Sequence, residues 1–117
     1  MPKTGDMASE RIARAKAYVS ASNDHDLSRI EKMLAADCFY QSSGVGQYQG
    51  VSDIIAMMRD FFGTYPDVRW RPSDFHLRAP ECVQFNFIIV LPKGENSGVE
   101  RLFFDGEGRV RGIQVER

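Results

Sequence analysis

Apolar residues recur at helical spacing in two segments near the start of the chain. Residues 7–22 place an apolar residue every three or four positions, which is typical of an amphipathic helix. The polar stretch 23–26 interrupts this pattern, and Asp26 is suited to cap a second helix. The apolar face of that helix carries Leu27, Ile30, Met33 and Leu34. Residues 1–6 are mostly polar, and we expect a flexible N-terminus there, ahead of a single domain over residues 7–117.

A third helix is predicted between Ser52 and Gly63. Ser52 can cap its N-terminus, Asp53 lies in its first turn, and Gly63 marks its C-terminal end. More than one face of this segment is apolar, with Ile54, Ile55, Met57, Met58, Phe61 and Phe62. We therefore expect this helix to be buried on most sides, with the methionines as adaptable core packing.

After residue 66 apolar and polar residues alternate with a period of about 2, which predicts β-strands. One short strand is expected earlier, at residues 38–41, before a loop at 42–46. The later strands are expected at residues 68–71, 75–78, 82–91, 99–104 and 110–115, with an interruption at Pro72, turns at 92–98 and 105–108, and a bulge at Gly112. Segregated helices and strands predict an α+β domain, in which three helices pack on one face of a curved antiparallel sheet.

The composition is that of an ordinary globular domain. Of 117 residues 43% are hydrophobic, and 15 basic side chains nearly balance 16 acidic ones. A formal net charge of −1 provides no basic field for nucleic acid, and no apolar run approaches the roughly 20 residues of a membrane span. The start lacks the apolar stretch of a signal peptide. Two cysteines are too few for a disulfide framework and suit a reducing compartment. We expect a cytoplasmic protein that binds neither nucleic acid nor membranes.

Motifs for metals and cofactors are not found in the sequence. His25 and His76 belong to no cluster with metal-ligand spacing. Gly44, Gly46 and Gly50 do not have the spacing of a dinucleotide-binding loop. We therefore expect neither a metal nor a cofactor.

Three strings in the chain carry a family resemblance. They are AKAYVSASNDHDLSRIEKMLAADCFYQ, GVSDIIAMMRDFF and RLFFDGEGRVRGIQVE. In this order and spacing they resemble the nuclear transport factor 2-like superfamily, and within it the steroid delta-isomerases and the SnoaL-type polyketide cyclases, from about Met7 onwards. The resemblance implies a cystatin-like α+β roll, in which a cone-shaped sheet wraps around the helices and leaves an apolar pocket at its open end. It also implies a homodimer through the outer face of the sheet.

The resemblance places catalytic chemistry at three positions. Steroid delta-isomerases use a carboxylate base, and a tyrosine and a protonated carboxylic acid hold the enolate oxygen. An ungapped register puts Tyr18 at the tyrosine and Ser42 at the base, and counting back from residues 104–105 puts Glu100 at the acid. A serine hydroxyl without a helper is not basic near neutral pH, so the family's base is expected to be missing. His76 and Glu100 are the remaining candidates for a base.

Ordinary structural roles are open for the same residues. Tyr18 is either a pocket donor or a half-buried tyrosine that reaches water, and Ser42 either faces the pocket or bonds nearby backbone at a strand end. Glu100 either points inward, where burial would raise its pKa, or outward into solvent. Asn86 and Gln84 either line the pocket or lie on the dimer face.

The remaining pocket residues are expected on the same elements. They are Tyr40, Met58, Phe62, Trp70, His76 and Asn86.

Two functions of different classes follow from this pocket. In the first, it binds a small apolar ligand without chemistry, as the missing base favours. In the second, an isomerase, cyclase or dehydratase acts on an apolar carbonyl-bearing substrate, with Tyr18 and Glu100 polarising the carbonyl oxygen.

Overall fold

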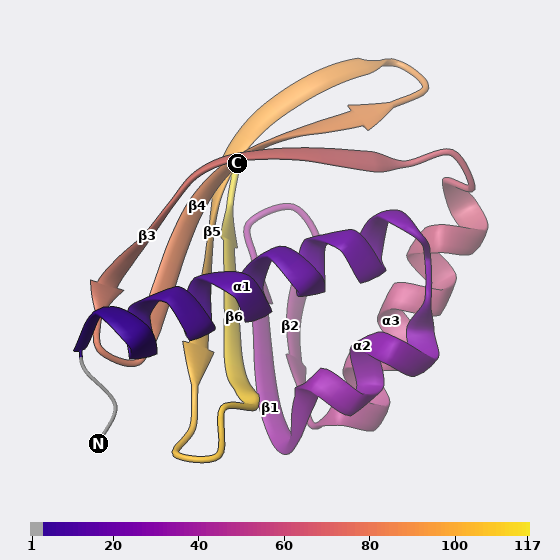
Figure 1. Ribbon diagram of the computed structural model, residues 1–117. Coiled ribbons are helices and arrows are strands. Elements are labelled where there is room, and N and C mark those ends of the chain that lie inside the picture. Colours follow the sequence, from indigo (N-terminus) through magenta and orange to yellow (C-terminus); the bar gives the residue numbers. More distant parts are fainter. Residues whose placement is uncertain (1–3) are drawn as a thin grey trace.

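A computed structural model describes residues 4–117, with side chains from Met7 onwards, and these residues form three helices and six strands. The helices are α1 (Thr4–Asn23), α2 (Leu27–Met33) and α3 (Val51–Thr64). The strands are β1 (Leu34–Ser42), β2 (Gly46–Gln49), β3 (Arg69–Ala79), β4 (Cys82–Leu91), β5 (Gly94–Phe104) and β6 (Val110–Glu116). The helices lie on one side of a curved sheet, and α1 crosses its face (Figure 1). The predicted α+β class is confirmed.

The six strands form one sheet in the order β2-β1-β6-β5-β4-β3. Strands β3 to β6 make the predicted antiparallel meander. The sheet is mixed rather than wholly antiparallel, because β6 inserts between β5 and β1 and runs parallel to β1. This pairing places Ser42 opposite Val115, so the ends of β1 and β6 meet at the same edge of the molecule.

Strand β4 supplies much of the core and has the bounds predicted for it. Every second side chain, Val83, Phe85, Phe87 and Ile89, faces the helices and is at most 2% exposed. Side chains on a strand alternate between the two faces, and Gln84 and Asn86 therefore lie on the outer face. That face also carries the neighbouring rings of Phe39 and Phe103. A homodimer through it stays a prediction.

Hydrogen bonds connect the turn between α1 and α2 to the start of β3. The side-chain amide of Asn23 donates to the carbonyl of Trp70 at 2.9 Å and accepts from the N–H of Trp70 at 2.7 Å. The His25 ring stacks on Phe62 with centroids 4.3 Å apart, and its Nε2 lies 3.0 Å from the carbonyl oxygen of Val68. These contacts fix the positions of Trp70 and Phe62 relative to α1.

Helices α1 and α2 differ from the prediction at their ends. Helix α1 begins at Thr4, three residues before the predicted start at Met7, and residues 1–3 of the predicted flexible N-terminus lie outside the described residues. The Asp26 cap is confirmed, since its Oδ1 accepts from the N–H of Arg29 at 3.1 Å. Leu34 begins β1 instead of completing the face of α2, because the backbone there is already extended.

Ser52 does not cap α3, contrary to the prediction. The cap position is Gly50, with φ 91°, and no side chain bonds the first turn. The N–H of Gly50 donates to the carbonyl of Cys38 at 2.7 Å, which ties the start of α3 to β1. This sharp turn needs a positive φ that glycine adopts readily. Gly63 lies inside the last turn, and α3 ends at Thr64.

Several strand predictions also need correction. Strand β2 was not predicted, β1 spans Leu34–Ser42 rather than residues 38–41, and β5 begins at Gly94 rather than Val99. Pro72 does not interrupt β3, because β3 is an edge strand in which proline is tolerated. The register of β3 shifts between Ser73 and His76 instead. An irregularity beside Gly112 is confirmed by the shift between β5 and β6.

No helix in residues 4–117 is long and apolar enough to cross a membrane.

Replacing Gly98 by alanine tests the packing between β5 and β6. A Cβ atom at Gly98 would lie 2.5 Å from both the carbonyl oxygen of Glu116 and the Phe87 ring. We expect Gly98→Ala to lower the free energy of unfolding by about 1–3 kcal/mol, measured by urea denaturation. Gly63→Ala is the control, since nothing lies within 4 Å of its Cβ and alanine favours a helix by about 0.5–1 kcal/mol. Equal stability of Gly98→Ala and the wild type would contradict the packing.

Candidate functional site

A cavity of about 60 Å³ lies between α1, α3 and the inner face of the sheet. This volume is about twice the roughly 30 Å³ that one water molecule occupies in the liquid. Most lining residues are apolar, and the apolar ones include the aromatic residues Phe61, Phe62, Trp70, Phe85 and Phe87. The polar residues in the lining are Tyr18, Ser22, Tyr40, Ser42, Glu100 and Arg117.

Different elements bring these polar side chains together. Tyr18 lies on the buried face of α1 with Ala15 and Val19. Tyr40 and Ser42 are two residues apart on β1 and therefore share the inner face. Glu100 comes from β5, from the same face as Leu102. The predicted site residues Tyr18, Ser42 and Glu100 thus line one cavity.

Glu100 is an acidic side chain enclosed by the core. It is 6% exposed, and burial raises its pKa from 4.5 to about 8. Among the described residues no side chain or backbone group forms a hydrogen bond with its carboxyl, although the oxygens are not sealed off from the cavity. At neutral pH the group is therefore mostly protonated, and its O–H is available as a donor.

Two phenols lie near this carboxyl. Burial raises the pKa of Tyr18, and the nearby Glu100 raises it further. Burial likewise raises the pKa of Tyr40, with Glu100 as the second cause and the Ser42 hydroxyl as an opposing one. Both phenols therefore stay protonated near neutral pH and can donate hydrogen bonds. Tyr18, Tyr40 and Glu100 form a group of three neutral donors in an apolar setting, which we call the donor cluster.

Ser42 combines the two roles that the sequence left open. It is 6% exposed and lines the cavity. Its Oγ also accepts from the backbone N–H of Gly44 at 3.2 Å, as a serine at a strand end commonly does. No histidine lines the cavity among the described residues. A hydroxyl in this setting has no group to take its proton.

Four further predicted pocket residues are in the lining: Tyr40, Met58, Phe62 and Trp70. The prediction was wrong for His76 and Asn86. Asn86 follows the opposite parity to Phe85 and Phe87, is exposed, and donates to Asp74 Oδ2 at 3.1 Å. His76 follows the register shift in β3, is exposed, and lies with Nδ1 2.9 Å from the backbone oxygen of Asp74.

Several residues that line the cavity were not predicted from the sequence. Phe85, Phe87 and Ile89 follow from strand parity once one face of β4 is known to be inner. Met57 and Phe61 adjoin residues that were predicted. Arg117 has no local signal, because its place depends on the parallel pairing of β6 with β1. Within residues 7–117 no group of three or more His, Cys, Asp or Glu side chains has an arrangement that could hold a metal ion.

The fold is shared with solved structures of low sequence identity. A cystatin-fold protein from Novosphingobium aromaticivorans matches with a TM-score of 0.81 and 14% identity, over 92% of this chain and 97% of that one. A ketosteroid isomerase candidate from Kribbella flavida matches with a TM-score of 0.80 and 17% identity, over 93% and 78%. SalBIII, an epoxide hydrolase/cyclase-like enzyme of pyran ring formation in salinomycin, matches with a TM-score of 0.75 and 16% identity, over 92% and 90%.

The family model of the SnoaL-like domain matches residues 15–102. The chain therefore belongs to the SnoaL-like family, within the nuclear transport factor 2-like superfamily. A search of curated protein sequences gave no significant match.

The raised pKa of Glu100 predicts how stability depends on pH. Between about pH 4.5 and pH 8 the folded state holds a proton that the unfolded state has lost. The stability that this proton contributes is fully present below about pH 4.5 and decreases as the pH rises towards 8, by about 1.4 kcal/mol per unit at most. Glu100→Gln cannot ionise. We expect its free energy of unfolding, relative to the wild type, to increase by a few kcal/mol from about pH 5 to pH 8.

Urea denaturation at several pH values measures this difference. Glu31→Gln is the matched control, because Glu31 is exposed on α2 and outside the cavity. A difference between Glu100→Gln and the wild type that does not change with pH would mean that Glu100 is not held in an apolar setting.

Proposed function

We propose that the cavity binds a small, mainly apolar molecule through one carbonyl oxygen. The observation that carries this proposal is the carboxyl of Glu100, which is buried, neutral at pH 7 and without a hydrogen-bond partner among the described residues. A carbonyl oxygen accepts hydrogen bonds and has no proton to donate. It therefore matches a site in which the carboxyl of Glu100 and the nearby phenols can each donate a hydrogen bond.

The other walls support an apolar ligand body. Aromatic rings from α3, β3 and β4 surround the cavity. Met57 and Met58 add unbranched side chains that adopt several rotamers. A cavity of about 60 Å³ is small, so a ligand larger than a few heavy atoms would enter by displacing such side chains. Compact cyclic ketones and enones are the first compounds to test.

The residues around the donor cluster favour binding over proton transfer. Proton abstraction next to a carbonyl needs a base within hydrogen-bond reach of the carbon-bound proton. The position that the family resemblance gives to the base holds Ser42, whose hydroxyl is bonded to the loop backbone. A bound carbonyl compound would then be polarised by the donors and released unchanged.

A second candidate function is an isomerase, cyclase or dehydratase reaction on the same class of ligand. A pKa of about 8 makes Glu100 able to give and take a proton near neutral pH. Donors aimed at a carbonyl oxygen also stabilise the negative charge that develops there when an enolate forms. In this alternative Tyr18 and the protonated Glu100 polarise the carbonyl oxygen. When Glu100 is ionised it acts as the base instead, and the phenols of Tyr18 and Tyr40 hold the oxygen.

Binding of cyclic ketones should depend on pH through Glu100. We expect a compound such as 1-tetralone to raise the melting temperature, with about 2.7 kcal/mol of stabilisation at 100 times its dissociation constant. Above about pH 8 the wild-type carboxyl ionises and stops donating, so affinity should fall up to about tenfold per pH unit. Glu100→Gln keeps a neutral N–H donor and should bind with little pH dependence, whereas Glu100→Leu should bind weakly throughout.

A panel of enones, terpenoid ketones, steroids and aromatic polyketides extends this test. Calorimetry gives the affinity of each hit, and product analysis after incubation separates the two functions. A ligand recovered unchanged supports a binding pocket, and an altered product supports the enzyme. If no carbonyl compound in the panel binds, the proposal is wrong.

The phenol of Tyr18 is tested separately. We expect Tyr18→Phe to weaken binding of the same compound by roughly three- to tenfold, the usual effect of losing one neutral hydrogen bond. Tyr48→Phe is the matched control, because Tyr48 contacts Tyr40 but does not line the cavity. Equal affinity of Tyr18→Phe and the wild type would remove Tyr18 from the donor cluster.

A further inference from the structure

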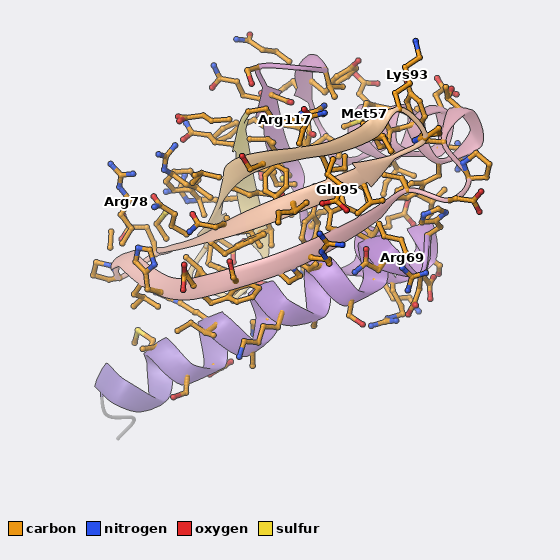
Figure 2. The ribbon with its side chains drawn as sticks, turned by 90° about the horizontal axis from the view of Figure 1, so that it is seen from above. Met57, Arg69, Arg78, Lys93, Glu95 and Arg117 are labelled. Carbon is orange, nitrogen blue, oxygen red and sulfur yellow. The ribbon has the colours of Figure 1, made fainter. Side chains whose placement is uncertain are left out.

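Arg117 brings a positive charge to the opening of the cavity. Its side chain belongs to the lining and is exposed, in contrast to the buried Glu100. The guanidinium is near enough to Tyr40 to lower the pKa of that phenol in part, against the larger effect of burial. The residue follows β6, and Figure 2 labels it together with Met57, another lining residue. Arg117 therefore lies where a ligand would contact both the cavity and solvent.

The loop after β1 holds Arg117 in place. The backbone N–H of Arg117 donates to Ser43 Oγ at 3.0 Å, and the N–H of Ser43 donates to the carbonyl of Val115 at 3.1 Å. The guanidinium lies over Gly44, where a Cβ atom would be 2.7 Å from Nη2 and 3.1 Å from Cζ. Both the backbone and the side chain of Arg117 are thus positioned by the residues that follow Ser42.

The charge around the cavity is unbalanced. Glu100 and Arg117 are the lining residues, among those described, with an acidic or a basic side chain. Glu100 is mostly neutral at pH 7, as derived above. Within residues 7–117 no carboxylate side chain lies within 4 Å of the Arg117 guanidinium, although five other ion pairs form. At neutral pH the lining side chains therefore include one cation, at the opening, and uncharged donors inside.

We propose that Arg117 binds a carboxylate of the ligand, and that the cavity takes an oxo acid, with its carbonyl oxygen at the donor cluster and its carboxylate at Arg117. A guanidinium and a carboxylate match in charge and geometry and form two parallel hydrogen bonds. The inference rests on the proposed function, because it assumes that the carbonyl end occupies the cavity. It adds the chemical class of the ligand and the direction in which the ligand lies.

The test uses matched pairs of aryl oxo acids and their primary amides. 3-Benzoylpropanoate and 4-benzoylbutanoate provide two spacings between carbonyl and carboxylate, and each amide keeps the shape while removing the charge. We expect the wild type to bind at least one acid roughly two- to fivefold more tightly than its amide, as an exposed ion pair would give. Raising the salt concentration should reduce this preference. Isothermal titration calorimetry on the full chain measures all affinities.

Variants assign the preference to Arg117. Arg117→Gln should bind acid and amide equally, and Arg117→Lys should keep part of the preference. Gly44→Ala should also reduce the preference for the acid, because the new methyl group displaces the Arg117 guanidinium without removing its charge. The backbone at Gly44 has no positive φ, so alanine can adopt the same conformation. Arg69→Gln is the control, since Arg69 is an exposed arginine at the start of β3 that does not line the cavity (Figure 2).

The outcomes separate this inference from the proposed function. Binding of the amides with no preference for either acid would overturn the inference and leave the carbonyl site intact. A preference that survives in Arg117→Gln would also overturn it, because another cation would then be responsible. If neither acid nor amide binds, both the inference and the carbonyl site fail for this class of compound. A preference lost in Arg117→Gln and kept in Arg69→Gln establishes the inference.

Discussion

Side chains along β5 alternate between the two faces of the sheet, and this alternation decides the character of the cavity. Leu102 and Phe104 must face the core, so Glu100, two residues earlier, faces it as well. An ionised carboxylate in that position would be strongly unfavourable, and the carboxyl therefore holds its proton up to a pKa of about 8. The other features of the site, the two protonated phenols and the aromatic walls, are arranged around this neutral acid.

The parallel pairing of β6 with β1 gives the site its second constraint. Because β6 lies between β5 and β1, the end of the chain meets the loop that leaves β1. Ser42 then faces the cavity from one strand while Val115 faces it from the next. Had β6 paired at the outer edge of β1, Arg117 would lie away from Glu100. The topology, rather than any local motif, thus places Arg117 and Glu100 in the lining of the same cavity.

The sequence predicts what local patterning determines. Strand β4 has its predicted bounds because its apolar run is flanked by turn residues on both sides. Tyr18, Ser42 and Glu100 were found because the family register needs no gap between Tyr18 and Ser42, or between Glu100 and residues 104–105. Strand β2 was not predicted, since it is a polar edge strand of four residues in which Tyr48 alone is half-buried. The start of α3 was misplaced because serine has the better capping side chain, whereas the tie from Gly50 to Cys38 required a positive φ.

The errors in the site have one physical origin. His76 and Asn86 were assigned to the pocket before the inner face of each strand was known. Asn86 lies on the outer face of β4, and the face of His76 depends on the register of β3, which one irregular residue reverses. The shift between Ser73 and His76 has no signal in the sequence apart from Pro72, which lies two residues before Asp74, the residue with φ 56°. Arg117 is the opposite case: its place in the cavity lining follows from the pairing of β6 with β1, which are far apart in the sequence. Cavity residues on β4 and β5 are therefore predictable from period-2 patterns, whereas those at β3 and after β6 require the long-range register.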